Sequence, residues 1–286
     1  MGAGFSVSAV CCEFRMPASK TRRILVTNDD GIGAPGIRAL ARAMAVLGEV
    51  WVVAPEKTQN AVGRAMTLHK PLRLQKIRTR WFAVNGTPAD CVTLALCKIL
   101  KGAQPAMVVS GINKGWNLGD DVTNSGTVAG ALEGMLHGIP SMAVSLDDCP
   151  GASNPVAADY AVDLGKCILK SGLPDGTILN VNVPGSKRGK IAGIQFTSLS
   201  QRRYHQPVVE KTDPRGGSYY WIAGERESWA RKKPSDHDAV ENNRVSVTPL
   251  HLDLTDYDAF DSLKDWERRR SVLPKQNLKK TKIKRP

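Results

Sequence analysis

The sequence predicts an α/β fold in which helices cover both faces of a doubly wound, mostly parallel sheet. The first observation is a repeated order of short apolar runs and longer segments with apolar residues at helical spacing. The second is that turn residues follow these apolar runs, as expected where buried strands stop. Ligand sites in such folds lie at the carboxyl ends of the strands, so candidate functional residues are sought there.

The first unit of this pattern covers about thirty residues, the usual size of a strand–helix–strand unit. Residues 23–27 form an apolar run that stops at Asn-Asp-Asp-Gly, and Pro35 then stands where a first helical turn accepts proline. Apolar residues recur at helical spacing over 37–47, and a second apolar run over 50–54 stops at Pro55. This order predicts two neighbouring parallel strands.

The same alternation continues along the chain. Further strands are expected at residues 106–110, 141–145 and 178–183, and further helices at 88–100, 127–137 and 154–169. After about residue 190, β-type runs and a charged stretch over 201–243 replace the helical spacing. We expect this part of the chain to form extended arms or hairpins, which oligomers often exchange between subunits.

Four segments are expected from these changes in pattern. They are a flexible amino-terminal extension (1–20, with Met16 as an alternative start), a Rossmann-like catalytic core (21–190), a β or extended arm region (191–262) and a basic disordered tail (263–286).

The net charge of +13 is concentrated at the carboxyl terminus. From Arg268 onward there are nine basic residues and no acid, which leaves a charge of +4 for residues 1–267. Such a tail is typical of a solvated segment, so we expect no specific nucleic-acid partner, with weak contact to RNA as the alternative.

The six cysteines form no C-x-x-C pair, and no apolar run approaches the ~20 residues of a membrane span. We therefore expect reduced, buried thiols in a cytoplasmic protein without a membrane partner.

Asp29 and Asp30 follow the first predicted strand. Adjacent carboxylates repel each other unless a positive group lies close to them. Oxygen ligands of this kind suit a hard divalent cation such as Mg²⁺ or Mn²⁺. The alternative is an ordinary turn into the following helix. We expect one divalent metal ion here, with Asp29 and Asp30 as catalytic residues and ligands.

Other predicted strand ends carry polar groups that support this interpretation. The loop over 59–63 offers an amide oxygen, and the Gly/Asn-rich stretch over 111–119 offers Asn113. A further helix begins near Ser125, Gly126 and Thr127, whose free backbone amides and hydroxyls are suited to phosphate. Simple helix capping by Ser125 or Thr127 is the alternative. Two carboxylates and two carboxamides would leave an open position for water on the metal.

Several motifs occur in the order found in one known family, and together they are more specific than any one of them. The motifs are Val26–Gly31, Val53–Pro55, Gly86–Cys91, Ser110–Asn113, Asn117–Gly119, Ser125–Val128 and Val245–Leu250. The sequence resembles the SurE family, the stationary-phase survival-protein 5′-nucleotidases, from about residue 22 to 256.

The resemblance implies a Rossmann-like fold whose arms are swapped in homodimers or homotetramers. It also implies metal-dependent hydrolysis of nucleoside monophosphates, with 3′-nucleotides and short polyphosphate as further candidate substrates. The family's metal ligands are two aspartates, a serine and an asparagine, which correspond to Asp29, Asp30, the position of Asn60, and Asn113. Asn60 stands where the family usually has serine, and its amide oxygen can still bind a hard cation.

Three other functions fit parts of the sequence. Gly31, Gly33 and Gly36 formally fit a dinucleotide fingerprint, but Asp29 and Asp30 would face its pyrophosphate. A phosphatase that forms an aspartyl-phosphate requires a carboxylate where Asn28 stands. A nucleotide sensor could use the same pocket without turnover, and phosphate release distinguishes it from an enzyme.

Overall fold

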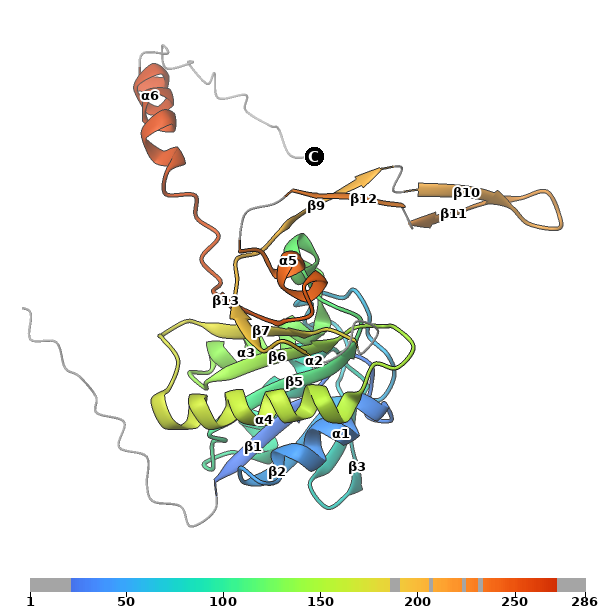
Figure 1. Cartoon of the computed structure of the whole chain (residues 1–286), viewed down its shortest axis with the longest axis vertical. Helices are drawn as coiled ribbons and strands as arrows, with labels where there is room; N and C mark the ends of the chain where they lie inside the picture. The colour runs from blue at the N-terminus through green and yellow to red at the C-terminus, as the bar shows by residue number, and fades with distance from the viewer. Residues whose placement is uncertain (1–21, 186–190, 206–207, 223–224, 231–233, 272–286) are drawn as a thin grey trace, which may run out of the picture. The chain divides into compact units, whose positions relative to one another are not determined.

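The computed structural model describes residues 22–185, 191–205, 208–222, 225–230 and 234–271 (Figure 1). The expected extension over 1–20 therefore lies outside the described residues. The chain divides after His251 into two compact units, which are described separately.

Within the described residues, nine strands form the main sheet in the order β3-β4-β2-β1-β5-β6-β7-β13-β8. The strands are β1 (Arg23–Thr27), β2 (Glu49–Pro55), β3 (Leu74–Arg78), β4 (Trp81–Val84), β5 (Met107–Lys114), β6 (Ser141–Leu146), β7 (Ile178–Val183), β8 (Ile194–Phe196) and β13 (Val245–Leu250). The six strands from β4 to β7 in this order are parallel, whereas β3 and β13 pair antiparallel with β4 and β7.

Helices cover both faces of this sheet because its central strands are apolar on both sides. On one face, α1 (Pro35–Met44) and α4 (Asn154–Ser171) pack together over residues that alternate along the strands, such as Ile24 and Val26. On the other face, α2 (Pro88–Leu94) continues into a π-helical turn (Ala95–Ile99) that covers Leu25.

Helix α3 (Gly126–Leu136) lies beside α2, on the face opposite α1 and α4 (Figure 1). The 3-10 turn Gly119–Thr123 precedes α3, and the short helix α5 (Asp236–Glu241) precedes β13. Together these elements confirm the predicted α/β fold with a mostly parallel sheet.

The sheet differs from the prediction in two details. Strands β3 and β4 were not predicted: β3 is exposed along its whole length and shows no apolar alternation, and β4 is an apolar run of only four residues. The strand predicted to end at Ser110 continues through Lys114, with an irregular register against β6 between Gly111 and Asn113. The pairing of β5 with β6 overrides the local preference of glycine and asparagine for loops.

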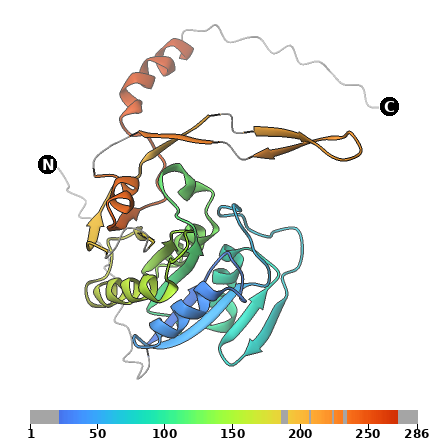
Figure 2. The ribbon, with the colours of Figure 1, turned by 45° about the vertical axis from the view of Figure 1, so that its right-hand side comes forward.

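Four strands of the later part of unit one form two-stranded ladders apart from the main sheet (Figures 1 and 2). They are β9 (Gln201–His205) with β12 (Glu225–Ala230), and β10 (Val208–Thr212) with β11 (Ser218–Ile222). These strands form within the stretch expected to be extended arms or hairpins. By contrast, β8 and β13, from the same expected region, belong to the main sheet.

The second unit contains helix α6 (Ala259–Ser271), which exposes Phe260, Leu263 and Trp266. The sequence predicted a disordered tail from residue 263, whereas α6 continues that far and ends at Ser271. Residues 272–286 lie outside the described residues. Of the helices that the structure describes, none combines the length and the apolar character needed to cross a membrane.

Candidate active site

Strand β1 lies between β2 and β5 and ends in the residues that lead into the candidate site. After Thr27, the buried Asn28 donates from its side-chain amide to the carbonyl of Gly31 at 3.0 Å. Gly31 has a φ of +96°, a conformation that glycine adopts easily. This turn leaves Asp29 and Asp30 at the carboxyl end of a central parallel strand, where ligands bind in such folds.

Asp29 is buried, and α3 holds its carboxylate. The hydroxyl of Thr127 donates to Oδ1 of Asp29 at 2.5 Å, and the Thr127 amide donates to Oδ2 at 3.1 Å. A Cβ at Gly126 would lie 2.8 Å from the Cβ of Asp29, so glycine permits the start of α3 to come this close. The first turn of α3 therefore fixes the orientation of Asp29.

Asp30 is only half-buried and faces another part of the site. Its Oδ2 accepts a hydrogen bond from the amide of Lys114 at 3.2 Å, and its carbonyl accepts one from the Thr58 hydroxyl at 3.2 Å. Burial raises the pKa of Asp29, and the charge of Asp30 raises it further against the opposing hydrogen bonds from Thr127. Burial also raises the pKa of Asp30. A cation between the two carboxylates would offset both effects.

The structure brings most of the expected site residues into one cavity. Asp29, Asn60, Asn113 and Ser125 all line a cavity of about 320 Å³. Asp30 instead lines a second cavity of about 590 Å³, and Lys114 lines both. The adjacent residues Asp29 and Asp30 thus line two different, neighbouring cavities.

The oxygen donors around Asp29 fit a hard divalent cation. Among the described residues, no group of three or more histidine, cysteine, aspartate or glutamate side chains could hold a metal ion. A cation here would therefore need neutral oxygens beside the two carboxylates. Asn113 can supply one, because its amide nitrogen donates to the Gly115 carbonyl at 2.8 Å and leaves Oδ1 for a ligand. Asn60 is exposed at the same cavity.

The residues expected to bind phosphate have additional structural contacts. The Ser125 hydroxyl accepts from the Val128 amide at 3.1 Å, so Ser125 caps α3. Thr127 uses its hydroxyl on Asp29, as described above. The first residues of α3 nevertheless lie against the carboxylate pair, with Ser125 on the wall of the smaller cavity.

Two polar residues of the cavity walls, Lys114 and Asn117, were given no role in the sequence-based prediction of the site. Lys114 lies between the cavities, and its ammonium group pairs with Asp148 at 3.2 Å. Asn117 is buried; its side-chain amide donates to Ser145 at 2.8 Å, and its carbonyl accepts from the side-chain amides of Asn180 and Asn182 at 2.9 and 3.1 Å. The two asparagines within the apolar β7 run were the signal that could have located this network.

Fold and site together define a class: a Rossmann-like α/β protein with paired carboxylates and amide oxygens at the ends of central strands. The model of the family "Survival protein SurE" matches residues 24–206. The chain belongs to the SurE family, as its resemblance had indicated.

Individual relatives match over most of their length. The chain is similar to the 5′-nucleotidase SurE of Geotalea daltonii, with 51% identity over 86% of this chain and 99% of that protein. It is also similar to the 5′-nucleotidase SurE of Moorella thermoacetica, with 52% identity over 82% of this chain and 92% of that protein. The crystal structure of the SurE protein from Aquifex aeolicus matches with a TM-score of 0.77 and 45% identity, covering 86% of this chain and 99% of that one.

Proposed function

We propose that this protein is a metal-dependent 5′-nucleotidase that releases phosphate from nucleoside monophosphates. The observation that carries the proposal is the carboxylate pair Asp29 and Asp30 at the end of β1, beside the amide oxygens of Asn60 and Asn113. Family membership and relatives with the name 5′-nucleotidase SurE support the same activity.

Asp29, Asp30, Asn60 and Asn113 are the proposed ligands of one divalent ion, Mg²⁺ or Mn²⁺. When bound, such an ion neutralises charge on a phosphoryl group and lowers the pKa of a coordinated water. Thr127 keeps Asp29 oriented, because its hydroxyl and its amide each bind one oxygen of that carboxylate. Asn60 takes the position of the family's serine with a longer side chain that still ends in an oxygen.

The start of α3 is the proposed phosphate-binding segment. Ser125, Gly126 and Thr127 form the amino-terminal end of a helix, where the dipole favours an anion. Because the amide and the hydroxyl of Thr127 bind Asp29, the backbone amides of Ser125 and Gly126 are the proposed donors to phosphate. Asp30 is better placed than Asp29 to accept the proton of an attacking water. Both oxygens of Asp29 accept hydrogen bonds from Thr127, whereas Asp30 accepts a single backbone hydrogen bond from Lys114.

The cavity of about 590 Å³ beside Asp30 is the proposed place of the leaving nucleoside. It is large enough for a ligand of this size and combines apolar residues such as Ile112 and Ala152 with the carboxylates of Glu56 and Asp148. Carboxylates repel a second phosphate but accept hydrogen bonds from ribose hydroxyls and base amino groups. Phosphate and nucleoside would thus occupy the two neighbouring cavities.

We also propose that the protein acts in the cytoplasm as a homodimer or homotetramer, with the β9–β12 and β10–β11 ladders as subunit arms. Exposed apolar residues on β11, among them Tyr220, Trp221 and Ile222, support a role in subunit contact.

A substrate panel tests the activity. Purified protein with Mg²⁺ or Mn²⁺ should release phosphate from 5′-nucleotides, and 3′-nucleotides and short polyphosphate belong in the same panel. Nucleotide binding without phosphate release would support a sensor in place of an enzyme.

Narrowing the larger cavity tests the nucleoside position. Ala152→Phe should raise KM for nucleoside monophosphates several-fold but change KM for p-nitrophenyl phosphate little, because the small substrate does not need the cavity. Ala45→Phe is a matched control at the exposed far end of α1. Equal effects of Ala152→Phe on both substrates would contradict this position.

A further inference from the structure

The loop between β2 and β3, residues 56–73, carries Asn60 and contains no helix or strand. It exceeds the ~12–15 residues beyond which structureless loops are uncommon in compact domains. Ala61, directly after Asn60, has a φ of +53°, which an alanine rarely adopts. The loop would not hold this conformation by its own preference, so contacts with the rest of the protein must impose it.

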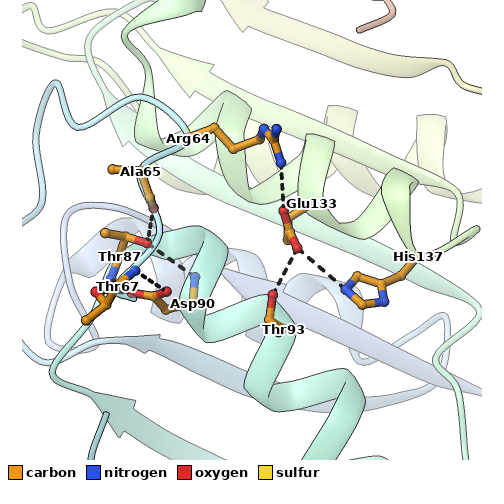
Figure 3. Close-up of polar contacts among 8 residues, drawn as sticks. All are labelled: Arg64, Ala65, Thr67, Thr87, Asp90, Thr93, Glu133 and His137. Carbon is orange, nitrogen blue, oxygen red and sulfur yellow. Dashed lines mark hydrogen bonds and ion pairs between the residues drawn. The ribbon is translucent and has the colours of Figure 1, made fainter. Parts of the chain in front are cut away.

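One set of contacts ties the middle of the loop to the start of α2 (Figure 3). The carboxylate of Asp90 accepts hydrogen bonds from the backbone amide and the hydroxyl of Thr67, at 3.0 and 2.6 Å. The Thr87 amide donates to the same carboxylate at 2.9 Å, and the Thr87 hydroxyl donates to the carbonyl of Ala65 at 2.7 Å. The Asp90 carboxylate thus accepts hydrogen bonds from this part of the loop, which has no neighbouring strand to pair with among the described residues.

A second set of contacts centres on Glu133 of α3 (Figure 3). Its side chain is only 7% exposed and lies 3.4 Å from the guanidinium of Arg64 in the loop. The Thr93 hydroxyl of α2 donates to the other carboxylate oxygen at 2.9 Å, and His137 lies 3.5 Å from it. A single buried carboxylate therefore joins the loop, α2 and α3.

A buried ion pair such as that of Glu133 and Arg64 often contributes no more to stability than apolar side chains of similar volume would. Stability alone therefore does not explain a carboxylate at this position. What the carboxylate adds is a directional contact with Arg64, four residues after Asn60. The first turn of α3 also contains Thr127, which binds Asp29. Nearer to Asn60, the amide of Gly63 donates to the Asn124 carbonyl at 2.8 Å, just before α3.

We propose that Glu133 is a positioning residue that holds the 56–73 loop so that Asn60 faces the cavity of Asp29 and Asn113. Its carboxylate does not line that cavity, so it acts on the site through the loop, whose middle Asp90 also ties to α2. This inference rests on the proposed function, because it assigns Asn60 to the metal site. It adds that side-chain contacts from α3 help to hold the loop of the third protein ligand, together with the backbone hydrogen bonds of Gln59 to Asp29 at 2.7 Å and of Gly63 to Asn124 at 2.8 Å.

The test is Mn²⁺ binding in the absence of substrate, followed by calorimetry or by the EPR signal of free Mn²⁺. Glu133→Gln keeps the shape of the side chain and its contact with Thr93 but removes the charge that holds Arg64. We expect a several-fold weaker Mn²⁺ affinity. In the Asn60→Leu background the same change should have no further effect, because the ligand that it positions is already lost.

Three further proteins make the result specific. Glu133→Gln in an Asn113→Leu background should still weaken Mn²⁺ binding, since Asn113 is held by β5 and not by the loop. Asp163→Asn, which removes an exposed carboxylate paired with Lys166 on α4, is the matched control and should leave binding unchanged. If Glu133→Gln does not fold, Arg64→Leu breaks the same contact from the exposed side.

Weakening of Mn²⁺ binding by the same factor in the wild-type and Asn60→Leu backgrounds would overturn the inference, as would unchanged binding in Glu133→Gln and Arg64→Leu. The wild-type protein separates this result from failure of the proposed function. If the wild-type protein binds Mn²⁺ and releases phosphate while the effects of Glu133→Gln and Asn60→Leu on Mn²⁺ affinity simply add, the positioning role of Glu133 is refuted and the proposed function stands.

Discussion

Asp29 and Asn60 line the same cavity, but different kinds of structure hold them. Asp29 follows β1, whose backbone pairs with strands on both sides, and Thr127 binds both of its carboxylate oxygens. Asn60 is exposed on a long loop without strand or helix, next to an alanine with positive φ. One side of the site is fixed by the pairing of the sheet, and the other is held by a few side-chain contacts and by isolated backbone hydrogen bonds such as that of Gln59 to Asp29.

This difference indicates where substitutions are tolerated. Groups at the ends of parallel strands are placed by the pairing of the whole sheet, so their positions follow from the fold itself. A ligand on a loop is placed by local contacts that can change together with it. Asn60 stands on the loop side, whereas both carboxylates stand on the sheet side. We therefore expect the effects of substitution to decrease from the strand end to the loop.

The largest loss of activity is expected at the strand end. Asp30→Asn removes one of the two charges that would hold the metal, so turnover should fall by more than the ~10–100-fold that loss of an outer-shell partner typically costs. Circular dichroism should show an intact fold, because Asp30 is only half-buried. Near-normal turnover in a folded Asp30→Asn protein would remove this carboxylate from the reaction.

Asp30→Asn should stabilise the metal-free protein against unfolding, although it lowers the turnover of the metal-bound protein. Burial raises the pKa of Asp30 and, with the charge of Asp30, that of Asp29. A carboxyl group with a raised pKa in the folded state stabilises that state at low pH, and this contribution is lost as the pH rises through the folded pKa. Removing one charge should therefore raise the Tm at neutral pH in EDTA, with a smaller gain near pH 4. A lower Tm at neutral pH would contradict the assumed repulsion.

An intermediate loss is expected where α3 orients the strand-end carboxylate. Thr127→Val keeps the shape of the side chain and the backbone hydrogen bond to Asp29, but it removes the hydroxyl donor. Turnover should fall by roughly 10–100-fold, and the free energy of unfolding by about 1–3 kcal/mol. Thr127→Ser, which retains the hydroxyl, should recover most of the turnover; equal losses in both variants would argue against the hydrogen bond.

The smallest loss is expected on the loop. Asn60→Ser keeps an oxygen with a shorter reach, so activity should survive with a changed metal requirement. Asn60→Leu is nearly isosteric but offers no oxygen, so it should weaken metal binding through the loss of one of several ligands. Activity titrated against Mn²⁺ concentration compares the three proteins. Superimposable curves for wild type and Asn60→Leu would leave Asp29, Asp30 and Asn113 as the proposed protein ligands.

The sequence predicted the position of Asp29 and Asp30 at the strand end better than it predicted the contacts that hold the loop of Asn60. Apolar runs that stop at polar turns locate strands directly, so the sequence alone places Asp29 and Asp30 at the carboxyl end of a strand. The contact between Arg64 and Glu133 spans residues far apart in the chain, and no local pattern indicates it. Strand β3 was missed for a related reason, because its exposed residues show no apolar alternation.

Metal dependence tests the central claim most directly. Protein treated with EDTA and freed of the chelator should release no phosphate from a nucleoside monophosphate, and added Mn²⁺ or Mg²⁺ should restore release. Calorimetry on the same samples should detect Mn²⁺ binding to the wild-type protein and a marked loss of binding in Asp30→Asn. Full activity in the metal-free protein, or equal Mn²⁺ binding by the wild-type and Asp30→Asn proteins, would contradict a metal site built on Asp29 and Asp30.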